Sequence, residues 1–396
     1  MFQSFFLAGF ECSAGYNMHG DWIDQIAATQ HDINAAADYG LLRHIGIAAA
    51  RDGLRWPLVE RGARYDFSTV KPLLAAARIH RIEVIWDLFH FGYPPDLDLL
   101  SPAFPARFAE YCYAATRFIA DQSDTRPALT PINEPSYFAW AAGDAARFAP
   151  HWHGRGPELK VALARAAIRG IEAIWSACAD ARIVNIDALC RTVAPVDRPE
   201  RASEADHFND QVVFESWDML CGRRMPELGG SSRHLGIVGI NYYWSNQWEL
   251  GTADVALAPN DVRRVSLREL LRTVWERYRT DLLITETAHV GDHRAAWLRE
   301  LAVEVAAILN AQIPLHGVCL YPILGMPEWH ARSEWARMGL WDLVPDGPRL
   351  LRQPYAPAME ALREILPIGV RRPPAERRAR RNAYRLPRPH LTANRS

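Results

Sequence analysis

The sequence predicts a single (β/α)8 TIM barrel, and three observations lead to that prediction. Short apolar runs with strand character alternate with longer stretches of helical period, which is the pattern of repeated βα units. Eight strand candidates can be counted, the number that closes such a barrel. The chain has 396 residues, 49% of them hydrophobic, and is therefore long enough to bury a barrel core.

The expected elements follow one another in a regular order along the chain. Strands are expected at Phe5–Phe10, Ile47–Asp52, Glu83–Phe89, Ala128–Asn133, Arg182–Asp187, Gly236–Tyr242, Leu282–Glu286 and Gly317–Tyr321. Helices are expected at Asp32–Ile45, Thr69–Arg81, Ser101–Asp121, Glu158–Asp180, Asp206–Cys221, Leu267–Tyr278 and Arg294–Ala311. The Pro/Arg-rich segment Leu189–Ala205 is expected to be a surface loop. Residues at the carboxyl ends of the strands should converge on one face of the barrel, where such barrels place their chemistry.

Charge separates the chain into two parts. The barrel is expected to occupy residues 1–368, and residues 369–396 form an Arg/Pro-rich tail. The net charge is −1, but residues 371–396 hold nine arginines against Glu376, which leaves about −9 for the rest. We expect the tail to be disordered and solvated, with contact to an anionic surface or nucleic acid as the alternative. The mildly acidic body argues against nucleic-acid binding by the barrel.

Cysteine and histidine spacing gives no sign of a metal site or a disulfide framework. The six cysteines show no CxxC and no pairing pattern, which fits a reducing compartment. His151 and His153 have no third ligand in register, so no metal is expected there. The apolar run at the amino terminus lacks a basic flank and is too short to span a bilayer. We therefore expect a cytoplasmic protein that does not associate with membranes.

Two glutamates at the ends of predicted strands are the most informative residues. Glu134 follows the fourth strand, and Glu286 ends the seventh. Burying an isolated carboxylate is costly, so a glutamate in such a place is more often part of a site than of a core. Glycoside hydrolysis uses two carboxyl groups, one to protonate the leaving oxygen and one to attack or shield the anomeric carbon. The fourth and seventh strands face each other across a small barrel, and both the retaining and the inverting spacing remain open.

The two glutamate motifs resemble those of glycoside hydrolase family 1, the β-glucosidase-like members of the clan A barrels. The resemblance covers most of Phe5–Leu343. Asn133-Glu134-Pro135 is similar to the acid/base motif of the family, in which the asparagine also holds the 2-hydroxyl of the sugar. Ile284-Thr285-Glu286 is similar to its nucleophile motif Ile-Thr-Glu-Asn-Gly, although Thr287-Ala288 replace Asn-Gly here.

A series of other positions aligns with the same family. Arg51, in Arg-Asp-Gly-Leu-Arg-Trp-Pro, is expected beside the nucleophile, where its charge would lower the pKa of Glu286. His90, in Phe-His-Phe, is expected to bind a sugar hydroxyl, and Tyr243, in Gly-Ile-Asn-Tyr-Tyr, to orient the nucleophile. The pair Glu328-Trp329 resembles the residues that bind the far hydroxyls of the sugar, by bidentate acceptance and by stacking.

Glu11 departs from the family pattern, which has a glutamine at this position that reads two sugar hydroxyls. A carboxylate offers acceptors only, so hydroxyl recognition would differ, and an amino or otherwise cationic substituent is an alternative partner. The chain is also shorter than usual for the family. Asp187, at the end of the fifth strand, is equally compatible with a site role and a scaffold role.

The resemblance implies a retaining exo-β-glycosidase that acts on a small-molecule glycoside. Glu286 would attack the anomeric carbon, and Glu134, in drier surroundings that raise its pKa, would act as acid and then as base. This chemistry requires no metal or organic cofactor. Two alternatives stay open: a transglycosidase with the same residues, and a catalytically silent carbohydrate-binding barrel. The sequence specifies neither the sugar, nor the aglycone, nor the oligomeric state.

Overall fold

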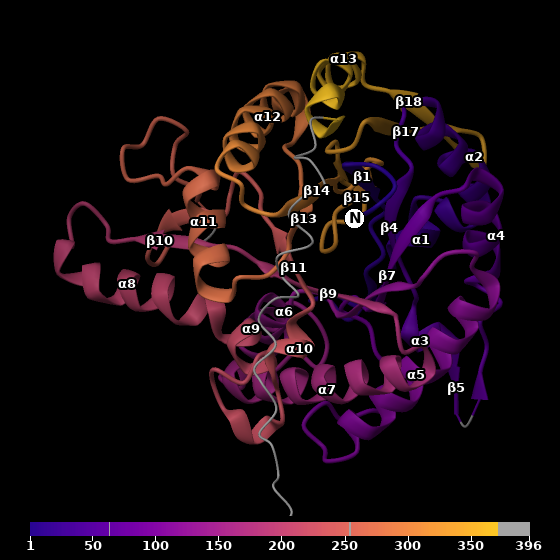
Figure 1. The fold of residues 1–396 in the computed structure, drawn as a ribbon, viewed down its shortest axis with the longest axis horizontal. Coiled ribbons are helices and arrows are strands. Elements are labelled where there is room, and N and C mark those ends of the chain that lie inside the picture. The colour runs from indigo at the N-terminus through magenta and orange to yellow at the C-terminus, as the bar shows by residue number, and fades with distance from the viewer. Residues whose placement is uncertain (63, 253–254, 371–396) are drawn as a thin grey trace, which may run out of the picture.

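The computed structural model describes residues 1–62, 64–252 and 255–370, and its centre is a closed barrel of eight parallel strands (Figure 1). Around the barrel the strands follow one another in chain order, and β14 pairs with β1 to close it. Their bounds are β1 Phe6–Gly9, β4 Ala49–Gly53, β7 Glu83–Phe89, β8 Ala128–Ile132, β9 Arg182–Ala188, β11 Ile237–Asn241, β13 Leu282–Thr287 and β14 Leu315–Leu320. The predicted (β/α)8 barrel is confirmed, and a strand lies at each of the eight expected places.

Helices surround the barrel, and small two-stranded sheets lie outside it (Figure 1). The helices that follow the barrel strands are α2 His31–His44, α4 Lys71–His80, α5 Phe104–Gln122, α7 Gly156–Ala177, α9 Glu215–Leu220, α11 Leu267–Tyr278, α12 Arg294–Asn310 and α13 Ala356–Ile365. Shorter helices are α1 Gln25–Ala28, α3 Trp56–Val59, α6 Pro135–Gly143, α8 Ala202–Asp210 and α10 Ser232–Leu235. The small sheets pair β2 Ala14–Tyr16 with β3 Trp22–Asp24, β5 Glu60–Arg61 with β6 Arg64–Tyr65, β10 Arg191–Val193 with β12 Gln247–Glu249, β15 Met326–Pro327 with β16 Trp335–Ala336, and β17 Trp341–Asp346 with β18 Arg349–Pro354.

Two expectations about the segment after β9 were wrong. The segment Leu189–Ala205 is not a plain loop, because it contains β10 and the start of α8. The single helix expected at Asp206–Cys221 is divided, since α8 ends at Asp210 and α9 begins at Glu215. Hydrogen bonds to β9 account for the division: the Ser216 hydroxyl donates to Asp187, and Trp217 Nε1 donates to the Asn185 carbonyl at 3.2 Å. These contacts hold α9 against the barrel, whereas α8 packs against β10.

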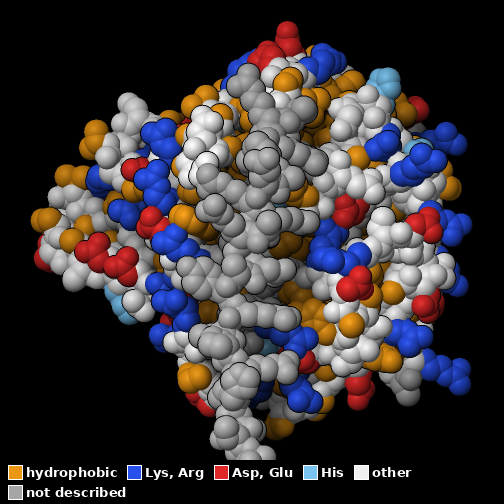
Figure 2. Space-filling view, in the orientation of Figure 1, with side chains coloured by type: hydrophobic (Ala, Val, Ile, Leu, Met, Phe, Trp, Pro, Cys, Tyr) orange, Lys and Arg blue, Asp and Glu red, His pale blue; other side chains and the backbone are white. Residues whose placement is uncertain are grey.

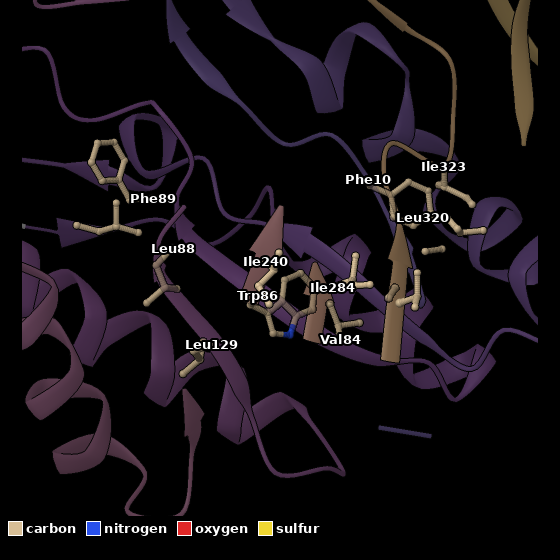
Figure 3. Packing of buried hydrophobic residues seen from close by; sticks show 14 of the residues in the cluster. Phe10, Val84, Trp86, Leu88, Phe89, Leu129, Ile240, Ile284, Leu320 and Ile323 are labelled. Carbon is tan, nitrogen blue, oxygen red and sulfur yellow. The ribbon is translucent and has the colours of Figure 1, made fainter. Parts of the chain in front are cut away.

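The barrel strands bury side chains on both faces, as expected for a parallel sheet covered by helices. One apolar cluster fills the barrel and includes Leu7, Ala49, Ile85, Val184, Leu283 and Cys319. A second and larger cluster lies between the strands and the helices. Figure 3 shows part of this outer layer, including Val84 and Trp86 of β7 with Ile240 and Ile284. At Gly9 the interior leaves no room for a side chain, because an added Cβ would lie 1.9 Å from the Tyr321 ring.

A buried charged network joins the hairpin β17–β18 to α2. His31 lies between two carboxylates, with Nδ1 2.8 Å from Asp38 and Nε2 3.0 Å from Asp52. Arg352 of β18 donates to Asp38 at 2.7 Å, and the Tyr39 hydroxyl donates to Asp52 at 2.7 Å. Burial by itself disfavours the imidazolium, but the two carboxylates outweigh it and raise the pKa of His31 to about 9.

The surface in Figure 2 carries Lys and Arg side chains over several elements, with Asp and Glu between them. Among the described residues, no helix is both long and apolar enough to cross a bilayer. The Arg/Pro-rich tail expected at residues 369–396 lies outside the described residues from position 371 onward.

Candidate active site

Strand periodicity carries a set of polar side chains to the carboxyl end of the barrel interior. Alternate residues of a strand face the same side, so the residue two places after an interior apolar residue also points inward. Arg51 follows interior Ala49 in this way, and Asp87 follows interior Ile85. On β11, Asn241 lies two places after Gly239 and is the register partner of Glu286 on β13. These groups therefore lie close together at the carboxyl end of the apolar cluster that fills the barrel.

Glu286 is held by two donors and is nearly covered. Its exposed fraction is 5%. Arg51 NH1 donates to Oε1 at 2.6 Å, and the Tyr243 hydroxyl donates to Oε2 at 2.7 Å. Arg51 is itself fully buried and forms a bidentate pair with Asp87, at 3.0 Å from Nε and 2.6 Å from NH2. The sequence therefore placed Arg51 and Tyr243 correctly beside Glu286.

The electrostatics of Glu286 differ from the sequence-based expectation. Burial raises its pKa above the ordinary value, and the charge of Arg51 offsets only part of this rise. Arg51 lowers the pKa of Glu286 as expected, but the larger opposing effect of burial was not anticipated. The expectation treated the arginine alone, whereas the carboxylate lies in a nearly water-free place where its charged form is costly.

Glu134 lies at a sharp turn between β8 and α6. Its backbone is left-handed, with φ 44° and ψ 59°, which a non-glycine residue rarely adopts, and it is the residue that precedes the first turn of α6. Asn241 Nδ2 donates to Glu134 Oε1 at 2.8 Å. Burial, together with the charge of Glu286, raises the pKa of Glu134 well above its ordinary value. Its exposed fraction is 9%.

Asp187 supports this turn and belongs to the scaffold. Its side chain accepts from the backbone N–H of Ser136 at 3.3 Å and from the Ser216 hydroxyl. It thereby ties the start of α6, directly after Glu134, to α9 on the outside of the barrel.

Asn133 and His90 continue the network away from the two glutamates. Asn133 Oδ1 accepts from Arg51 NH2 at 2.7 Å, and its Nδ2 lies 3.1 Å from His90 Nε2. His90 Nδ1 lies 3.0 Å from Asp87 Oδ2. Glu11 Oε1 lies 3.7 Å from His90 Nε2 and accepts from the Ser13 N–H at 2.9 Å. The structure therefore brings Glu11, His90 and Asn133 into one cluster with Arg51.

The pair Glu328-Trp329 is placed differently from the rest. Trp329 is half-buried and packs edge to face against Phe91 and Phe148, with ring centroids 5.6 and 5.5 Å apart. Glu328 is exposed, and its carboxylate makes none of the side-chain hydrogen bonds found within the described residues. Partial burial, with the nearby charge of Glu334, raises the pKa of Glu328. Only the tryptophan of the pair is packed into the structure.

Sequence reasoning missed two residues that hold the cluster together, Asp87 and Asn241. Each is a polar residue within a predicted strand, an even number of positions from apolar residues that face the barrel interior. This spacing indicates that its side chain also faces the interior. Asp87 anchors both Arg51 and His90, and Asn241 links Glu134 to β13 through the Thr285 hydroxyl, which donates to Asn241 Oδ1 at 2.8 Å.

One cluster among the described residues has metal-ligand chemistry: Cys12, Asp87 and His90, whose donor atoms lie within 4.8 Å of one another. Both oxygens of Asp87 are already bonded to the Arg51 guanidinium, whose positive charge opposes a cation there. The pair expected not to bind metal is engaged elsewhere. His151 Nε2 lies 2.7 Å from the Asn17 carbonyl, and His153 Nδ1 lies 3.1 Å from the Asp144 carbonyl.

The barrel of this chain has the same fold as solved structures of a β-glucosidase. A solved structure of the family 1 β-glucosidase from Thermotoga maritima matches with a TM-score of 0.72 and 17% identity, over 93% of this chain and 98% of that chain. Structures of the Thermotoga maritima β-glucosidase in complex with glucoimidazole and with castanospermine match with TM-scores of 0.73 and 0.72, at 16% identity and the same coverage. No family model and no curated protein matches the sequence. At this identity the likeness establishes the fold.

Proposed function

We propose that this protein is a retaining exo-β-glycosidase of the family 1 type, acting on a small-molecule glycoside with a terminal β-linked sugar. One observation carries the proposal. Glu134 follows β8 and Glu286 lies near the end of β13, and one hydrogen-bonded network through Asn241, Asn133 and Arg51 joins them. Paired carboxyl groups in different surroundings are what glycoside hydrolysis requires.

In the first step Glu286 is the nucleophile. Arg51 and Tyr243 each donate to one of its oxygens, so the carboxylate is oriented and its charged form is stabilised despite burial. Its oxygen forms a bond to the anomeric carbon as the bond from that carbon to the leaving oxygen breaks. Glu134 gives its proton to that oxygen, so the aglycone leaves as a neutral alcohol.

In the second step Glu134 is a carboxylate and acts as the base. It takes a proton from water, whose oxygen attacks the anomeric carbon and releases Glu286. Two displacements at one carbon retain the configuration. Glu134 begins the cycle protonated because burial and the Glu286 charge raise its pKa well above the ordinary range, and the release of that charge on glycosylation favours its ionisation.

Covalent labelling tests the nucleophile directly. Purified protein would be incubated with cyclophellitol-type epoxides in the gluco and galacto configurations, and the labelled peptide would be located by mass mapping. We expect a single label on Glu286, since the epoxide is opened by the residue that attacks the anomeric position. The matched control is Glu286→Gln, which keeps the size of the side chain and should take no label.

Three outcomes can be distinguished. A label on Glu286 in one configuration also identifies the preferred sugar. A label on another carboxylate would identify that residue as the nucleophile and contradict the assignment of Glu286. No label on folded wild-type protein with either epoxide, together with no release of the aglycone from aryl β-glycosides, would overturn the hydrolase proposal.

A further inference from the structure

The cluster at the barrel mouth holds more negative than positive charge. Asp87 and Glu286 both bond to Arg51, so one guanidinium is shared by two buried carboxylates. Glu11 adds a third carboxylate with an exposed fraction of 5%. Besides burial, the charge of Glu11 raises the pKa of Glu286, which places the two carboxylates within electrostatic reach of each other.

His90 is the side chain whose ring nitrogen lies 3.7 Å from Glu11, but its hydrogen bonds are directed to Asn133 and Asp87. Asn133 Oδ1 accepts from Arg51, so the amide is oriented with Nδ2 toward His90. Because an amide NH2 only donates, His90 Nε2 is the acceptor in this contact and is not directed at Glu11. The proton of the ring is then on Nδ1, where it points at Asp87 Oδ2 at 3.0 Å. Glu11 receives no hydrogen bond from this imidazole, whose Nε2 lies 3.7 Å from Oε1.

Glu11 is also incompletely bonded. Oε1 accepts from the backbone N–H of Ser13 at 2.9 Å, whereas Oε2 has no hydrogen-bond partner among the described residues. The neighbouring Ser13 hydroxyl is buried and likewise unpaired. A buried carboxylate without a cation is costly, and it is kept where a ligand supplies the missing charge.

We propose that the glycone of the substrate carries a protonated amino group that pairs with Glu11. This inference rests on the proposed glycosidase function and names the class of sugar, an aminodeoxy sugar, that the site recognises. An ammonium group donates up to three hydrogen bonds and carries one positive charge. It can therefore both hydrogen-bond the free oxygen of Glu11 and reduce the excess of negative charge. The hydroxyls of a neutral sugar could hydrogen-bond Glu11, but they would leave the excess of negative charge unchanged.

Direct binding separates the two kinds of glycone. The probes are methyl β-glycosides of the 2-, 3-, 4- and 6-amino-deoxy sugars in the gluco and galacto series, with the neutral methyl β-glycosides as comparators. Affinities would be measured by calorimetry at pH 6.5 for the wild type and for Glu11→Gln. Glutamine keeps an acceptor for the Ser13 N–H, and a thermal unfolding scan checks that the variant is folded. Glu11→Asp, which keeps the charge, is a second variant.

In the wild type we expect at least one amino isomer to bind tenfold or more tightly than its neutral comparator. Glu11→Gln should lower the affinity for that isomer at least tenfold and should not lower the affinity for the neutral glycoside, because a glutamine can hydrogen-bond sugar hydroxyls, while Glu11→Asp should retain part of the preference. If no amino isomer is preferred by the wild type, or if the preference survives in Glu11→Gln, the inference is wrong.

The outcome is independent of the hydrolase test. Preference for an amino sugar without any hydrolysis would uphold the binding assignment and remove the proposed reaction. Epoxide labelling of Glu286 without a preference for any amino sugar would uphold the reaction and remove the inference about Glu11.

Discussion

Replacing His31 with glutamine should remove a pH-dependent part of the stability of the barrel. In the wild type the imidazolium lies between Asp38 and Asp52, and all three side chains are buried. Its pKa is raised from 6.5 to about 9 in the folded protein. A raised folded-state pKa stabilises the fold at pH values below the unfolded pKa, and this contribution is lost as the pH rises through the folded pKa. The relevant window is therefore pH 6.5 to about 9.

The size of the effect follows from the two pKa values. They differ by about 2.5, and each pH unit between them is worth ~1.4 kcal/mol, so the contribution is about 3 kcal/mol at pH 6.5 and close to zero above pH 9. Glutamine is uncharged at every pH in this window, so the variant lacks the contribution throughout. The wild type should exceed the variant by about 3 kcal/mol more at pH 6 than at pH 9.5.

Urea unfolding followed by tryptophan fluorescence gives the free energy of unfolding of both proteins across this range. Titration of groups distant from His31 cancels in the difference between the two proteins, because they share every other residue. A difference in unfolding free energy that stays constant from pH 6 to pH 9.5 would refute the assignment of a buried imidazolium at His31.

Two further predictions concern Glu134. Glu134→Ala should lower the turnover of aryl glycosides with poor leaving groups by ~10²–10⁴-fold, and azide should restore turnover of activated aryl glycosides, because their leaving groups need no acid; no rescue by azide would argue against Glu134 as acid/base. Asn241→Ala should move the basic limb of the pH profile of kcat/KM to higher pH, since the hydrogen bond from Asn241 lowers the pKa of Glu134; an unchanged limb in a folded variant would show that this hydrogen bond does not tune the acid.

The barrel was predictable from the sequence because its signals are local and repeated. Each strand is a short apolar run, and each is bounded by turn or helix residues, so position and order could be assigned independently for every unit. The hairpin β17–β18 was missed because its two strands mix apolar residues with charged residues and proline, unlike the continuous apolar runs of the barrel strands. Even apolar residues of the hairpin, such as Val344 and Leu351, are exposed. The break between α8 and α9 was missed since it depends on contacts with β9 that lie about 30 residues away in the chain.

At the candidate site, motif spacing located the residues but not their electrostatics. Arg51, Tyr243 and Glu286 lie together as expected. The pKa of Glu286 could not be predicted, because it depends on how completely the side chain is removed from water. Glu328 and Trp329 were expected to act together, but Glu328 is exposed and only Trp329 packs against Phe91, in a segment that bends directly after β15.

The ion pair between Arg352 and Asp38 has a consequence for the order in which the protein can form during synthesis. The two residues are 314 positions apart, so Asp38 leaves the ribosome well before Arg352. Until the hairpin that carries Arg352 has been made, this acid lacks its guanidinium and has only His31 as a charged partner, so its burial is less well compensated. Helix α2 can therefore reach its final packing only after the hairpin β17–β18 has emerged, which favours late, concerted closure over unit-by-unit assembly.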